Sequence, residues 1–245
     1  MDRLYQKSKI WFAVFWIVIY VVGTSIADTV SKAVGTEKSI TLVYLLVLSV
    51  FAFFWLGKKG LLARYGLCWP RISAKKMLYY IPLVILASCN LWFGVTMNFG
   101  LTETVLYVGS MLLVGFLEEL IFRGFLFEAM RKDGLKAAVI VSSLTFGIGH
   151  IVNLFNGSGA ELLPNLCQVF YAVAAGFVFV ILFYKTGSLL PCIATHSVLN
   201  ALSAFAVPLG SGQQIFMAAV LCMIPVLYAL YLLKIKVIPE GNENA

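Results

Sequence analysis

The stretch FLEELIFRGFLF, from Phe116 to Phe127, decides how the rest of the sequence is interpreted. It places Glu118, Glu119 and Arg123 within a segment that otherwise has the composition of a transmembrane helix. An ionised side chain at the centre of a bilayer costs roughly 2.5–3.5 kcal/mol on insertion scales, so such residues are rare and are associated with function. The rest of the chain should therefore contain polar partners for these charges.

The composition is that of a polytopic membrane protein. The chain has 245 residues, of which 61% are hydrophobic and 12% are charged, and its mean hydropathy is +0.95. A soluble domain typically carries about 25% charged residues, so we expect one all-α membrane domain over residues 1–245. The net charge of +7 does not indicate nucleic acid as a partner, because the basic residues gather at the ends of apolar segments. The expected partner is the lipid bilayer.

Eight apolar segments predict eight transmembrane helices. The first segment ends in Ser25-Ile26-Ala27, which resembles a signal-peptidase site, but the orientation of the other segments requires this helix and we expect it to be retained. Polar residues then predict a loop over 28–39. The predicted spans are 10–27, 40–56, 77–95, 104–129, 136–151, 165–184, 189–207 and 214–233.

The distribution of lysine and arginine predicts the orientation of these spans. Eight spans place both termini on one side, and 15 of the 18 basic residues fall on that side, against Lys32 and Lys38 on the other. Cytoplasmic loops carry the excess of basic residues in membrane proteins. We therefore predict a multi-pass protein of the cell membrane with both termini in the cytoplasm. The basic loop 57–76 is interpreted as part of this topology signal.

Two further predicted spans contain polar residues at helical spacing. The chain has only two histidines, His150 and His196, and both lie in apolar segments. Phe146 precedes His150 by four residues, so its ring can pack beside the imidazole and limit its rotamers. Asn200 follows His196 by four residues, so the two side chains can share one ligand.

The two adjacent glutamates are expected to differ in role. Glu119 and Arg123 are four residues apart on a helix, so they can pair and offset the cost of each other's burial. Glu118 points about 100° away from Glu119 around the helix axis. We therefore predict that Glu118 is the carboxylate left available for chemistry.

The polar residues of three spans are predicted to lie at similar depth. At 1.5 Å per residue, Glu118 lies about 20 Å from Arg131 along its helix. The corresponding distances are about 21 Å from Lys136 to His150 and about 16 Å from Lys185 to His196. Glu118, His150 and His196 are therefore expected to meet.

Such a cluster allows several kinds of chemistry. A glutamate can act as general base on water, or the carboxylate and imidazoles can hold a metal ion that activates water. Asn200 and a histidine could stabilise the oxyanion of a tetrahedral intermediate. The sequence contains neither a G-x-S-x-G elbow in a span nor paired aspartates in separate spans, so serine and aspartyl proteolysis are not supported. A purely structural role and proton-coupled transport remain alternatives.

These motifs resemble those of the CAAX protease and bacteriocin-processing family of intramembrane endopeptidases, also called the Abi or type II CAAX prenyl endopeptidase-like family. Phe122-Arg123-Gly124 also looks like the family's usual continuation of the first motif. The resemblance covers about residues 105–205, which would form a four-helix catalytic core, with residues 10–95 and 214–233 as peripheral helices. The three motifs, E-E-x-x-x-R, F-x-x-x-H and H-x-x-x-N, stand at Glu118 to Arg123, Phe146 to His150 and His196 to Asn200.

The resemblance implies an eight-helix bundle around a water-accessible cavity and hydrolysis of peptide bonds near the membrane. Glu118 would be the general base on the attacking water, with His150 as its partner. His196 and Asn200 would stabilise the oxyanion. Glu119 and Arg123 would hold the other site residues in position.

The resemblance leaves the question of a metal open. We expect no cofactor and a metal-free, glutamate-activated mechanism. A zinc ion held by Glu118, His150 and His196 is the alternative.

The expected partner is a peptide or membrane-protein substrate. The short chain is more similar to prokaryotic members, which are linked to bacteriocin and signalling-peptide processing, immunity and membrane-protein regulation. A non-catalytic member that binds and regulates a partner is the main alternative, and a proton-coupled transporter is the third. The sequence indicates neither the cleavage position nor the oligomeric state.

Overall fold

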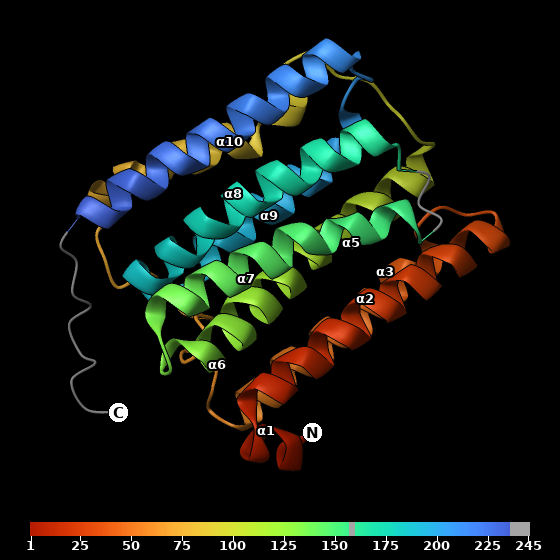
Figure 1. Cartoon of the computed structure of the whole chain (residues 1–245). Coiled ribbons are helices and arrows are strands. Elements are labelled where there is room, and N and C mark those ends of the chain that lie inside the picture. Colours follow the sequence, from red (N-terminus) through yellow and green to blue (C-terminus); the bar gives the residue numbers. More distant parts are fainter. Residues whose placement is uncertain (157–159, 236–245) are drawn as a thin grey trace.

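All regular elements of the chain are helices in the part that the structure describes, which is residues 1–156 and 160–235 of a computed structural model (Figure 1). An isolated β-bridge pairs Val95 with Ala206. The predicted all-α fold is therefore confirmed. The α-helices are α1 (Asp2–Lys7), α2 (Lys9–Val34), α3 (Ser39–Lys58), α4 (Ile81–Ala87), α5 (Leu101–Glu119), α6 (Glu128–Arg131), α7 (Leu135–Gly149), α8 (Leu162–Thr186), α9 (Leu190–Leu202) and α10 (Ser211–Lys234).

Five short helical segments extend or join these α-helices. A π-helix, η3, spans Leu120–Phe127 and connects α5 to α6. The others are 3₁₀-helices: η1 (Ala74–Tyr80), η2 (Cys89–Leu91), η4 (His150–Leu154) and η5 (Ser203–Phe205).

Within the described residues, six helices are long and apolar enough to cross a membrane, so the chain has the build of a multi-pass membrane protein. The predicted count of eight spans is not confirmed. Six predicted spans correspond to these helices, within a few residues at most ends. The helices are Lys9–Val34, Ser39–Lys58, Leu101–Arg131, Leu135–Leu154, Leu162–Thr186 and Ser211–Lys234.

The other two predicted spans are shorter or broken. The prediction of one helix over 77–95 is wrong, because Leu78, Tyr79 and Tyr80 adopt left-handed backbone angles and α4 runs only from Ile81 to Ala87. The predicted span 189–207 corresponds to Leu190–Phe205. It ends where the chain becomes extended, with Thr96 donating its backbone N–H to the Phe205 carbonyl.

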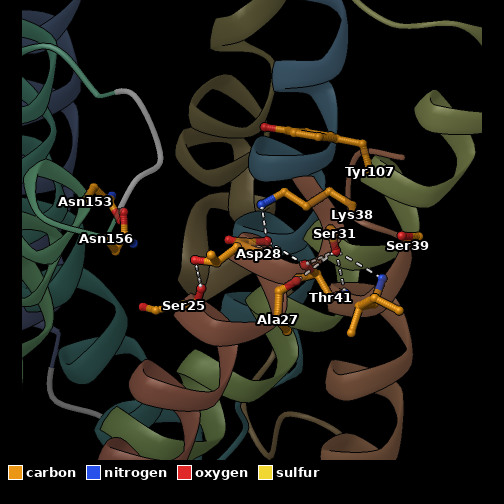
Figure 2. A network of polar contacts seen from close by, with 12 residues as sticks. Ser25, Ala27, Asp28, Ser31, Lys38, Ser39, Thr41, Tyr107, Asn153 and Asn156 are labelled. Carbon is orange, nitrogen blue, oxygen red and sulfur yellow. Dashed lines mark hydrogen bonds and ion pairs between the residues drawn. The ribbon is translucent and has the colours of Figure 1, made fainter. Parts of the chain in front are cut away.

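The first helix is longer than predicted. The residues expected to start a loop at Asp28 continue α2 to Val34, since their polar groups find partners on the following segment. Asp28 accepts hydrogen bonds from Lys38, at 2.8 Å, and from Thr41 (Figure 2). Gly35, with φ 78°, then ends the helix in the left-handed conformation that glycine adopts without strain.

The long helices run side by side, with α2 and α3 on one side of the bundle and α10 on the opposite side (Figure 1). Helix α5 packs on α9 and α3, and α8 packs on α7 and α10. The largest hydrophobic core lies between α2, α3 and the α5–η3 helix, and its buried residues include Trp16, Leu45 and Phe125. The elements that carry the three motifs therefore lie in the interior of the bundle.

The basic segments gather at one end of the bundle. Lys59 pairs with Asp2 at 2.6 Å, and Arg71 donates its backbone N–H to Thr186 at 3.1 Å. Lys185 donates to the carbonyl of Ile235 at 2.9 Å. These contacts bring together the N-terminal helix, the loop 57–76, the end of α8 and the end of α10, as the alternation of spans requires. The orientation of this end in a membrane stays a prediction.

Candidate active site

The stretch Phe116–Phe127 changes from an α-helix to a π-helix at its two glutamates. Glu118 and Glu119 are the last residues of α5, and all eight residues of η3 are buried. The wider turn of a π-helix interrupts the regular backbone hydrogen bonds of the α-helix. Within this turn, the Phe122 carbonyl accepts a hydrogen bond from the Ser142 hydroxyl of α7 at 2.8 Å. Single π-turns within α-helices occur often at functional sites.

Glu119 lies at the centre of a fully buried polar cluster. Its Oε1 accepts from Arg123 Nη1 at 3.1 Å and lies 2.8 Å from His196 Nδ1. The side chains of Glu119 and Arg123 are both 0% exposed. The Arg123 guanidinium also stacks over the Phe146 ring, 4.0 Å from its centroid. The predicted Glu119–Arg123 pair is confirmed, and the structure adds His196 to it.

Glu118 differs from Glu119 in its hydrogen-bond partners and in its exposure to a cavity. Its Oε1 accepts a hydrogen bond from the Tyr20 hydroxyl at 2.7 Å, and its Oε2 lies 3.4 Å from His196 Nε2. Its side chain is 13% exposed and lines a large cavity between the helices, called the main cavity. His196 thus lies between the two carboxylates. The predicted division of the glutamates, one paired with arginine and one available, matches this geometry.

His150 is held in one orientation by its own helix. Its Nδ1 lies 3.0 Å from the Phe146 carbonyl, and because a carbonyl only accepts, this nitrogen carries the hydrogen. In the neutral ring, Nε2 then has the free lone pair. The Phe146 ring contacts the imidazole edge-on at 5.1 Å, as predicted, and Asn165 donates to the His150 carbonyl at 2.9 Å.

A cavity of about 590 Å³ brings the motifs together. Glu118, Phe146, His150 and Asn200 all line it. A second cavity of about 70 Å³ shares Phe146, His150 and Asn200 with the first and adds His196. The predicted convergence of the three motif-bearing helices on one site is therefore confirmed, and their common depth in a membrane stays a prediction.

The side chains suggested as a zinc site do not form a ligand set. No group of three or more His, Cys, Asp or Glu side chains within residues 1–156 and 160–235 is placed to hold a metal ion. His150 and His196 each use Nδ1 for a protein contact, which leaves Nε2 of each ring as the nitrogen that could meet a ligand. The metal-free mechanism stays a prediction.

Gly115 is a positioning residue that sequence analysis missed. A Cβ built on it would lie 2.5 Å from the Ser197 backbone nitrogen and 2.6 Å from its Cα. Helices α5 and α9 therefore approach each other closely one turn before Glu119 and next to His196. Small residues allow such close helix contacts in membrane proteins.

We expect Gly115→Ala to destabilise the protein by about 1–3 kcal/mol, because the methyl group forces α5 and α9 apart. Thermal unfolding of the purified protein in detergent measures this. Gly212→Ala in α10 is the matched control, since no atom lies within 4 Å of its added Cβ. Equal stability of the two variants would contradict the close contact.

Residues 100–202 match the family model described as type II CAAX prenyl endopeptidase, Rce1-like. This segment, which is less than half of the chain, is similar to the CAAX protease family. Every motif residue of the candidate site lies within the matched segment, which begins at the residue before α5 and ends with α9. No curated protein and no solved structure matches the chain. The description of that family names an endopeptidase activity.

Tyr20 lies outside the segment that matches the CAAX protease family, yet it contacts Glu118 directly. It comes from α2, is 6% exposed, and forms part of the main cavity wall. A tyrosine in an apolar helix has no spacing relation to the motifs, so no sequence signal could have identified it. The family motifs alone therefore do not complete the surroundings of the candidate base.

Proposed function

We propose that the chain is an intramembrane endopeptidase in which Glu118 activates the water that attacks a peptide bond. The observation that carries this proposal is the position of Glu118. It lines a cavity together with His150 and Asn200, whereas the neighbouring Glu119 is enclosed with Arg123. A glutamate placed between solvent-accessible space and fixed hydrogen-bond donors is suited to general base catalysis.

The proposed reaction begins with a water molecule between Glu118 and the substrate carbonyl. Glu118 accepts one proton from the water, and the resulting hydroxide oxygen bonds to the carbonyl carbon. The Tyr20 hydrogen bond to Oε1 fixes the carboxylate, and Oε2 lies 3.4 Å from His196 Nε2. His150, whose Nε2 holds a lone pair in the neutral ring, assists by accepting a hydrogen bond from the same water.

The negative charge on the carbonyl oxygen then needs donors. Asn200 lines both cavities, and His196 places Nε2 beside Glu118, where a hydrogen on that nitrogen is the proposed second donor. The 3.4 Å distance from this nitrogen to Glu118 is longer than a good hydrogen bond, so the N–H is available to an oxyanion formed beside Glu118. The C–N bond breaks as the proton held by Glu118 passes to the leaving nitrogen.

The proposed substrate is a peptide segment or a membrane-protein tail that reaches the cavity. The description of the similar family names a prenyl endopeptidase. The reacting group is the peptide bond of a prenylated or an unmodified peptide. Processing of bacteriocin-like or signalling peptides by a prokaryotic protein is one form of this activity.

We expect His150→Ala to abolish processing while the protein still accumulates in the membrane, because the attacking water loses one of its two acceptors. Mass spectrometry of secreted and membrane peptides, compared between wild type and variant, measures the loss and reveals substrates. Ile148→Ala is the matched control on α7, since Ile148 is 51% exposed and lies on the outside of the bundle. An unchanged peptide profile in His150→Ala would argue for a non-catalytic regulator or a transporter.

A further inference from the structure

The main cavity extends from Glu118 toward one end of the bundle. Along α2 its wall continues from Tyr20 through Ser25 to Asp28, which is away from the N-terminus. Along α5 it continues from Glu118 back to Tyr107, toward the start of that helix. Both directions lead to the same end, because α2 and α5 run in opposite senses across the bundle.

Connecting segments close to that end also line the cavity. They include Lys38 before α3, Asn153 in η4, Ala160 before α8, and Asn90 in η2. Figure 2 shows Asp28 of α2 and Lys38, just before α3, pointing toward each other in this region. Their side chains are 21% and 13% exposed, so the pair is partly open to the cavity. The cavity thus reaches from the candidate base to the loops at this end.

This end is the one with few basic residues. The opposite end holds the N-terminal helix, the loop 57–76 and the segments around Arg131 and Lys185, which together contain most of the lysine and arginine. The end at which the cavity opens holds Lys32 and Lys38. The excess of basic residues marks the cytoplasmic side of a membrane protein. The cavity and the basic loops therefore belong to opposite sides of the membrane.

We infer that the active-site cavity opens to the outer face of the cell membrane and takes its substrate, an exported peptide segment, from that side. The inference rests on the proposed function for the identity of the substrate, but its geometric part is independent of activity. An extended peptide entering past Asp28 and Lys38 would reach Glu118 without crossing the ring of basic loops.

The test uses single-cysteine variants of the full chain in which the five native cysteines are replaced. Ser25→Cys reports on the cavity wall, and Ser73→Cys is the matched control in the exposed basic loop. Ala33→Cys, at an exposed position near the end of α2, is a second reporter that does not alter the cavity. Intact cells are treated with a membrane-impermeant maleimide before and after permeabilisation.

We expect Ser25→Cys and Ala33→Cys to be labelled in intact cells, and Ser73→Cys to be labelled only after permeabilisation. The reverse pattern would overturn the inference, because the cavity would then open to the cytoplasm. Labelling of Ala33→Cys without labelling of Ser25→Cys in either condition would also overturn it, because the cavity would be closed to water. Labelling requires no catalysis, so a failure of the proposed function would leave this result unaffected.

Discussion

Glu118→Gln is expected to eliminate peptide processing, with a loss of about 10²–10⁴-fold in rate, because an amide cannot accept the proton of the attacking water. The substitution keeps the size of the side chain. Its carbonyl oxygen can still accept the hydrogen bond from Tyr20, which is 2.7 Å long in the wild type. The protein should therefore accumulate normally. Comparison of secreted and membrane peptides between variant and wild type measures the loss.

Glu161→Gln provides the matched control for this experiment. Glu161 is exposed and precedes α8, away from the polar cluster of Glu119 and Arg123. The same change of charge there should leave the peptide profile as in the wild type. If Glu118→Gln also leaves it unchanged, the chain is not a glutamate-dependent protease, and the regulatory alternative gains support.

Arg123→Met is expected to cost about 3–5 kcal/mol of stability, because it leaves the buried Glu119 carboxylate without its cation. Both side chains are 0% exposed, so water cannot replace the lost partner. Methionine retains much of the apolar stem that packs beside Phe146. A large fall in the unfolding temperature in detergent, or loss of the protein from the membrane, would be the observed result.

The same helix offers a matched control for the arginine. Arg131 pairs with Glu128 at 3.3 Å, but its side chain is 38% exposed. Exposed ion pairs contribute at most about 1 kcal/mol, so Arg131→Met should change stability little. The double variant Glu119→Leu with Arg123→Met should recover part of the lost stability, because no buried charge then lacks its partner. Equal losses for Arg123→Met and Arg131→Met would contradict the buried pair.

The sequence predicted much of the site because its signals are local. Charges in an apolar helix are costly, so Glu118, Glu119 and Arg123 were identifiable without a structure, and helical spacing predicted the Glu119–Arg123 pair. The count of residues from each basic helix end predicted that His150 and His196 would reach the same depth. Each of these inferences needs only the geometry of one helix and the thickness of a membrane.

Other features depend on contacts between distant segments. The expected helix over 77–95 was wrong because hydropathy does not report the left-handed backbone at Leu78 to Tyr80. The expected loop at Asp28 was wrong because Lys38 and Thr41 satisfy its carboxylate across a turn. In both places the backbone conformation is decided by partners that the local pattern does not reveal.

Burial cost and helical periodicity act within single segments, so the membrane class, the three motif-bearing helices and the pairing of Glu119 with Arg123 could be predicted from the sequence alone. The groups that surround Glu118 come from distant segments and are set by the tertiary structure. It placed Tyr20 against one carboxylate oxygen, set His196 between the two glutamates, and allowed α5 and α9 to meet at Gly115. It also decided the direction in which the cavity opens, because that direction depends on how all the helices pack together.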